Sequence, residues 1–149
     1  PLMNDSDFSV ERVVDAVDDV AGWLDSVKDV HSSVSLLGFS MGMAVASTLL
    51  RHRPADFAAV VGLSGFVVPA EGNPFFHDDE LTAGGVPFFW GRDQNDPVID
   101  APRIEYTHAW LNEHTALTKI LYSNMGHGIN MQELGHVREF LTHTVLGAR

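Results

Sequence analysis

The chain has 149 residues, and its 20 acidic against 9 basic side chains give a formal net charge of −11, which disfavours binding to nucleic acids and anionic membranes. Its length fits a single domain (1–149) with a sizeable core, and the absence of cysteine excludes disulfides, thiolate metal sites and cysteine nucleophiles. No stretch has the pattern of a signal peptide or of an uninterrupted membrane span, so we expect a cytoplasmic protein.

The predicted elements alternate between helix and strand. Apolar residues recur at helical spacing over residues 9–29, and Ser9 is the expected N-cap of this helix. Further helices are predicted at 41–53, 100–113 and 130–145, and short apolar runs predict strands at 34–39, 57–63, 86–90 and 118–122. Residues 64–85, with several glycines and prolines, are predicted to form a long connection with little regular structure. The alternation predicts an α/β fold, a parallel sheet with helices on both faces.

Residues 38–42 read G-x-S-x-G, at the point where a predicted strand ends and a predicted helix begins. This is the nucleophile elbow, a turn so tight that we expect glycine to be required at both flanking positions, Gly38 and Gly42. The helix directs its free N–H groups toward the same place, so the backbone N–H of Met41 is a candidate donor to a substrate oxyanion. Ser40 is therefore the candidate nucleophile.

A serine hydroxyl needs a base, and the chain has eight histidines. His127 stands between two glycines in the loop after the last predicted strand. Because the strands are parallel, this loop opens at the same edge of the sheet as Ser40. His77, in the acidic loop, is an alternative that its position alone does not exclude.

An acid that orients the imidazole is expected after the third strand, where the chain offers Asp93, Asp96 and Asp100. Asp100 begins the next helix and is expected to cap it. We favour Asp96 over Asp93, which stands close to the strand end where it would close a turn. No histidine stands at ligand spacing beside these acids, and no nucleotide-binding glycine motif is present, so we expect neither a metal site nor a cofactor.

Aromatic residues are candidates for an apolar wall around the acyl group of a substrate. The alternative for the aromatic residues of the long connection is that they pack the loop onto the sheet. The candidate substrate-binding residues are Phe66, Phe75, Phe76 and Trp90.

The order Ser40, Asp96, His127 on these junctions resembles the α/β-hydrolase superfamily. Within it, residues 37–42, 89–99 and 125–129 are similar to the corresponding segments of the phospholipase/carboxylesterase family, which includes acyl-protein thioesterases. The resemblance runs from about residue 8 to 145. It implies that the chain hydrolyses a small-molecule carboxylic ester or thioester through an acyl-enzyme.

The chain departs from that family in several places. Met41 stands where the family usually has glutamine, Trp90 where it usually has histidine, and the segment between Gly91 and Asp96 is longer. The superfamily also has several strands before the helix that precedes the elbow, and one is followed by a loop of the oxyanion hole. We therefore expect the strand at 34–39 to be an edge, covered by a missing N-terminal segment or by a second copy in a homodimer. A non-catalytic or truncated homologue that acts as a binding module is the alternative function.

Overall fold

The computed structural model describes residues 9–70 and 72–147. Its centre is a parallel sheet in which neighbours along the chain are also neighbours in the sheet, in the order β1-β2-β3-β4. The strands are β1 (Leu36–Phe39), β2 (Val60–Leu63), β3 (Pro87–Asp93) and β4 (Ala116–Tyr122). The predicted parallel α/β architecture is confirmed, and all four strands run toward the same edge of the sheet.

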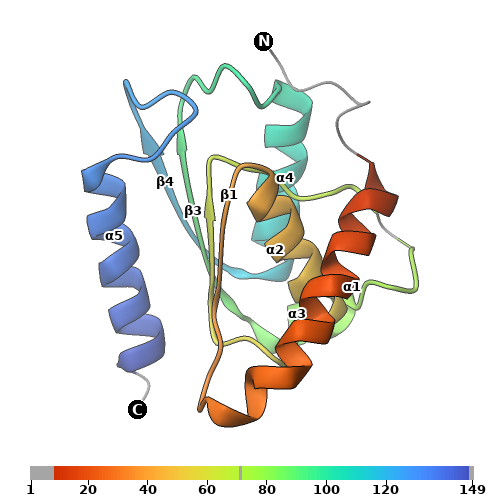
Figure 1. Ribbon diagram of the computed structural model, residues 1–149. Coiled ribbons are helices and arrows are strands. Elements are labelled where there is room, and N and C mark those ends of the chain that lie inside the picture. The colour runs from red at the N-terminus through yellow and green to blue at the C-terminus, as the bar shows by residue number, and fades with distance from the viewer. Residues whose placement is uncertain (1–8, 71, 148–149) are drawn as a thin grey trace.

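Helices cover both faces of this sheet, with α1, α2 and α4 on one side and α5 on the other (Figure 1). The helices are α1 (Val10–Val27), α2 (Met41–His52), α3 (Asp78–Gly84), α4 (Ala101–His114) and α5 (Met131–Leu141). A 3-10 turn follows α1 at Lys28–Val30, and a π-helical turn follows α5 at Thr142–Leu146. Ser9 and Asp100 cap α1 and α4 as the sequence predicts, each side chain accepting a backbone N–H three residues on.

The long connection after β2 contains a helix that the sequence pattern does not predict. Residues 64–85 are not wholly irregular, because α3 forms at Asp78–Gly84. Three acidic residues in its first turn interact favourably with the helix dipole, and Gly85 ends it in the left-handed conformation, φ 60°. The helix has only 7 residues, too few to show a helical repeat in the sequence.

Each face of the sheet has its own core because successive side chains along a strand point to opposite sides. Val60, Phe88 and Trp90 pack with the helices of one face, whereas Val61 and Phe89 pack under α5. The strands nearest the middle are therefore apolar on both faces, as expected for a buried parallel sheet. Among the described residues, no helix combines the length and apolar character needed to cross a membrane.

Strand β1, which leads to Ser40, is an edge of the sheet in the described part of the chain. Among the residues that the structure describes, it pairs with β2 on one side only. Leu37 and Phe39, on the face of β1 away from α2, are 59% and 40% exposed, and Trp23 of α1 is 65% exposed. The expected open edge is thus present, with apolar side chains around it.

Helix α5 places one carboxyl group in the interior. The Glu133 side chain is fully buried, and neither of its oxygens has a hydrogen-bond partner in the described structure. It lies against Gly91, where a Cβ atom would come within 2.1 Å of Glu133 Oε2. Burial raises the pKa of Glu133 to about 7.

We expect Glu133→Gln to change the pH dependence of stability. The unfolded chain ionises Glu133 near its ordinary pKa of 4.5, whereas the folded chain keeps the proton up to about pH 7. The wild type therefore loses stability as the pH rises between these values, and the variant keeps it. In urea unfolding, the variant should gain about 1–2 kcal/mol over the wild type between about pH 5 and about pH 8.

The matched control is Glu139→Gln, which replaces an exposed glutamate of the same helix. Its stability should follow the pH dependence of the wild type. Equal pH dependence in the wild type and in Glu133→Gln would show that the buried carboxyl group does not titrate as described.

Candidate active site

Ser40 stands on a sharp turn between β1 and α2. Its backbone has φ 57° and ψ −120°, a left-handed φ that is uncommon for a residue with a side chain. The Ser40 N–H donates to the carbonyl of Leu63 at 2.8 Å, which ties the turn to the end of β2. This is the strained strand-to-helix turn of a nucleophile elbow, and it holds the serine at the carboxyl edge of the sheet.

The glycines around the elbow have unequal roles. A Cβ atom at Gly38 would lie 2.1 Å from the carbonyl oxygen of Gly42, so Gly38 is required by the turn. At Gly42 a Cβ atom would meet no described residue within 4 Å, so the prediction that both flanks require glycine is wrong there. Gly65, just after β2, is required instead, because its Cβ would come within 2.5 Å of the Ser40 carbonyl oxygen.

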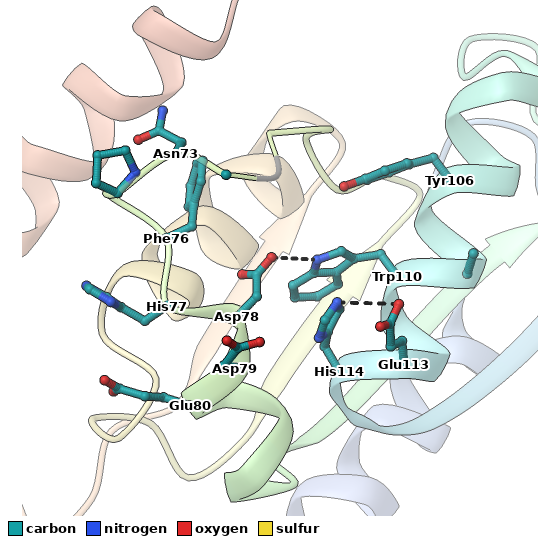
Figure 2. Close-up of a pocket in the computed structure, with 13 residues that line it drawn as sticks. Asn73, Phe76, His77, Asp78, Asp79, Glu80, Tyr106, Trp110, Glu113 and His114 are labelled. Carbon is teal, nitrogen blue, oxygen red and sulfur yellow. Dashed lines mark hydrogen bonds and ion pairs between the residues drawn. The ribbon is translucent and has the colours of Figure 1, made fainter.

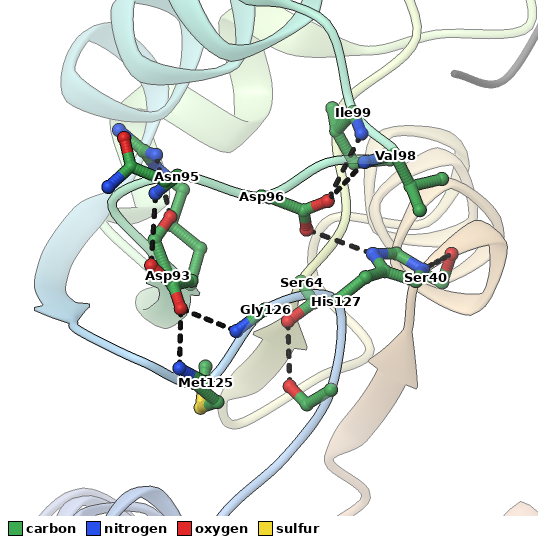
Figure 3. Close-up of polar contacts among 12 residues, drawn as sticks. Ser40, Ser64, Asp93, Asn95, Asp96, Val98, Ile99, Met125, Gly126 and His127 are labelled. Atoms are coloured by element: carbon green, nitrogen blue, oxygen red, sulfur yellow. Dashed lines mark hydrogen bonds and ion pairs between the residues drawn. The ribbon is translucent and has the colours of Figure 1, made fainter. Parts of the chain in front are cut away.

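Ser40, His127 and Asp96 form a continuous chain of hydrogen bonds (Figure 3). His127 Nε2 lies 2.8 Å from Ser40 Oγ, and Nδ1 lies 2.9 Å from Asp96 Oδ2. The Asp96 side chain is 2% exposed and that of His127 is 19% exposed. With the ring proton on Nδ1, the imidazole donates to Asp96 and accepts the serine hydroxyl proton, which is the geometry of a serine nucleophile with its base.

Asp96 is held in place by backbone donors. Its Oδ1 accepts the N–H groups of Val98 at 2.7 Å and Ile99 at 3.2 Å, which leaves Oδ2 directed at His127. The preference for Asp96 over Asp93 as the partner of the imidazole agrees with these contacts. Asp93 is buried nearby and makes different bonds.

The Asp93 carboxylate accepts backbone N–H groups rather than the imidazole. Oδ1 accepts from Asn95 at 3.0 Å, and Oδ2 accepts from Met125 and Gly126 (Figure 3). These bonds, with that of Asn95 the largest cause, hold the pKa of Asp93 below its usual value. The sequence predicts a turn at Asp93, but not its bonds to a loop 32 residues further on.

His77, the alternative base, is not near this chain of hydrogen bonds. Its backbone N–H donates to the carbonyl of Arg51, close to the C-terminus of α2, whereas Ser40 precedes the N-terminus of the same helix. Met41 is the first residue of α2, so its N–H is one of the groups without a partner inside the helix, next to the serine. In the described residues, no group of three histidine or carboxylate side chains has the geometry to hold a metal ion.

The four aromatic residues predicted to contact substrate do not surround Ser40. Phe66 and Trp90 are both 0% exposed because they belong to the core between the sheet and the helices. Phe76 packs on Arg51, and Phe75 stacks on His52, at the far end of α2. These placements correct the predicted wall and support the alternative that the aromatic residues pack the loop onto the sheet.

An aromatic residue outside the predicted substrate-binding set lies beside the base. The ring of Phe39 is 5.2 Å from that of His127, and Phe39 is 40% exposed. Its signal in the sequence was its position immediately before the nucleophile in the G-x-S-x-G segment. Ile129, two residues after the histidine, is 42% exposed. Apolar surface is therefore available at this edge of the sheet.

A cavity of about 690 Å³ lies away from this site, between the 72–80 segment and α4 (Figure 2). Asp78, Asp79, Glu80 and Glu113 give it an acidic lining, and Trp110 donates its ring N–H to Asp78 at 3.2 Å. None of Ser40, Asp96 and His127 lines it. The hydrogen-bonded chain, and not this cavity, is the candidate active site.

Comparisons with known proteins agree with the geometry. The phospholipase/carboxylesterase family model matches residues 11–145. A SOBER1 variant from Arabidopsis thaliana superimposes with a TM-score of 0.81 at 19% identity, covering 97% of this chain and 70% of that one. A Bacillus cereus carboxylesterase gives a TM-score of 0.75 at 21% identity, covering 92% and 64%.

A carboxylesterase from Mesorhizobium loti has a TM-score of 0.75 at 16% identity, covering 95% of this chain and 66% of that one. No curated protein matches the sequence. The chain thus spans between 64% and 70% of the length of these three solved structures. At such identities the likeness shows the α/β-hydrolase fold.

The elbow geometry predicts opposite outcomes for its two glycines. Gly38→Ala should destabilise the protein by roughly 1–3 kcal/mol, because its methyl group would overlap the Gly42 carbonyl. Gly42→Ala has room and lies in a helix, so it should be neutral or stabilising by about 0.5 kcal/mol. Urea unfolding of the two variants tests this difference, and equal losses of stability would contradict the described turn.

Proposed function

The chain belongs to the phospholipase/carboxylesterase family, and on that premise we propose that it is a serine hydrolase that cleaves carboxylic esters through a Ser40–His127–Asp96 triad. The observation that supports this most strongly is the pair of contacts on His127, 2.8 Å to Ser40 Oγ and 2.9 Å to Asp96 Oδ2. Three side chains from three loops meet in the order that nucleophilic catalysis requires.

In the proposed reaction, Ser40 Oγ attacks the carbonyl carbon of the ester while His127 Nε2 takes the hydroxyl proton. The carbonyl oxygen becomes an oxyanion, and the Met41 N–H at the start of α2 stabilises it. His127 then gives its proton to the leaving alkoxide, and the alcohol departs from an acyl-Ser40 ester. Water attacks this ester while His127 takes the proton of the water, and a second tetrahedral intermediate forms. When it collapses, His127 returns the proton to Ser40 Oγ, so the serine hydroxyl is restored and the carboxylic acid is released.

Asp96 acts on the imidazole and not on the substrate. It holds the ring with Nε2 toward Ser40 and stabilises the imidazolium that forms in each half of the reaction. The backbone N–H groups of Val98 and Ile99 bond to its Oδ1 and so fix the direction of Oδ2. Asp96→Asn would keep the shape of the side chain and remove the charge that stabilises the imidazolium of His127.

The surroundings of the proposed triad favour an uncharged ester with an apolar acyl group. Phe39 and Ile129 offer exposed apolar surface beside His127, whereas the net charge of −11 disfavours anionic substrates. Thioesters react by the same steps, and the relative rates for an ester and a thioester with the same acyl group measure that preference. The cytoplasmic location expected from the sequence stays a prediction.

We expect Ser40→Ala to fold and to lower the turnover of a p-nitrophenyl ester by roughly 10⁴–10⁶-fold, since the nucleophile is lost. Ser35→Ala, which replaces an exposed serine before β1, is the matched control and should keep wild-type activity. More than a tenth of wild-type activity in Ser40→Ala would rule out this serine as the nucleophile.

The alternative is a homologue that binds a ligand without turnover. It is favoured by the fact that the Met41 N–H is the one candidate oxyanion donor that we identify among the described residues. The two functions are separated by a fluorophosphonate, which labels an activated serine. A folded wild type that neither turns over esters nor reacts with the phosphonate would support the binding module, whereas stoichiometric labelling with turnover would support the enzyme.

We also propose that a further strand pairs with the edge of β1 in the working protein, supplied by additional polypeptide. The support is the one-sided pairing of β1, its exposed Leu37, and the greater length of the solved relatives. An unpaired parallel strand is a template for association, so the chain alone should self-associate at high concentration.

Leu37→Lys should reduce this self-association in light scattering, because a lysine on an edge strand blocks pairing. The exposed Val30→Lys, outside the sheet, is the control and should leave association unchanged. A monomer whose 36–39 amides are as protected from hydrogen exchange as those of β2 would contradict the open edge. A defined dimer that Leu37→Lys dissociates would identify a second copy, and not additional polypeptide, as the partner.

A further inference from the structure

The loop between β4 and α5, residues 123–130, carries His127 and is called the histidine loop below. Two of its residues, Asn124 and Gly126, have left-handed backbone conformations, φ 60° and φ 65°. This conformation strains the backbone of Asn124, whereas a glycine would adopt it without strain. A loop of this shape keeps one conformation only if contacts from the rest of the protein hold it.

Asp93 makes such contacts from the end of β3. Its Oδ2 accepts the N–H groups of both Met125 and Gly126, the two residues directly before the base (Figure 3). Asp93 is only 3% exposed, so water does not compete strongly for these bonds. A charged acceptor bonded to backbone N–H groups forms stronger hydrogen bonds than a neutral one.

Asp93 also shapes the turn that carries the acid of the proposed triad. Its Oδ1 accepts the N–H of Asn95 at 3.0 Å, and this bond closes a turn that ends directly before Asp96. Asp96 is the residue that contacts His127. One carboxylate thus bonds to the backbone of both loops, the one with the acid and the one with the base. The relative position of Asp96 and His127 depends on it.

A second anchor holds the other side of the histidine loop. Ser64, buried after β2, has φ 50°, and its hydroxyl donates to the carbonyl of Gly128 at 2.9 Å. Its own backbone N–H donates to the carbonyl of Gly91 at 2.9 Å. His127 therefore lies between two points of attachment, at residues 125–126 and at 128.

From these contacts we propose that Asp93 is a positioning residue of the hydrolase, which holds His127 in line with both Asp96 and Ser40, and that Ser64 is its counterpart on the far side of the base. This inference rests on the proposed function. The ring must satisfy contacts of 2.8 Å and 2.9 Å at once, and a displacement of about 1 Å lowers rates roughly 100-fold in enzymes.

The test compares Asp93→Asn with Asp100→Asn, which changes a carboxylate that caps α4 and bonds to Arg103 of that helix. The amount of protein that a fluorophosphonate labels at completion gives the concentration of folded, active protein in each sample, and kcat is calculated from that concentration. Asp93→Asn should lower kcat for a p-nitrophenyl ester roughly 10- to 100-fold with KM within about twofold of wild type. Asp100→Asn should leave both constants unchanged.

Ser64→Ala supplies a second variant, which keeps the proposal testable if Asp93→Asn does not fold. It should lower kcat several-fold, and the double variant should lose less than the product of the two single effects, because both act on one loop. A wild-type kcat in folded Asp93→Asn or in Ser64→Ala would overturn the positioning role, as would a change confined to KM.

A measurement without substrate separates this inference from the proposed function. If the wild type lacks esterase activity, the proposed function fails, and hydrogen exchange still tests the attachment of the loop. The Met125 and Gly126 amides should exchange at least about tenfold faster in Asp93→Asn than in wild type, with the strand amides unchanged. Equal exchange in the two proteins would overturn the inference.

Discussion

The approach of two backbones at the elbow is the constraint on which the rest of the site depends. The end of β1 at Gly38 comes so close to the start of α2 that only a hydrogen atom fits between them. The chain must therefore turn within one residue, and that residue is Ser40, with its left-handed φ of 57°. The hydroxyl then projects at the carboxyl edge of the sheet, where the loops after β3 and β4 also emerge.

Helix α2 is fixed at its far end by a second interaction, which keeps the elbow from relaxing. Arg51 is fully buried, and its guanidinium bonds to both oxygens of Asp78, at 2.9 Å and 2.8 Å, and to the carbonyl of Val68. The ring of Phe76 lies 4.2 Å from the guanidinium carbon. A buried charge with all these partners is costly to displace, so α2 is tied down at both ends.

The sequence alone was sufficient to predict the architecture and the three polar residues that meet at the sheet edge, because both follow from regular spacing. Parallel strands end at one edge, so residues in the loops after them come together whatever their separation along the chain. Spacing says nothing about the direction of an aromatic ring, and for that reason Phe66 and Trp90, which fill the core, were predicted to line the site. A helix as short as α3, with seven residues, shows no periodic pattern in the sequence. The bonds from Asp93 to the backbone of the histidine loop leave no such pattern either.

The central claim is that Ser40 is a nucleophile activated by His127, and mass spectrometry after reaction with a fluorophosphonate tests it most directly. We predict one adduct per chain, located in the peptide that contains Ser40. In a folded His127→Gln variant the adduct should form about a hundredfold more slowly or slower still. An adduct that forms at the same rate without the imidazole, or one found on another residue, would contradict it.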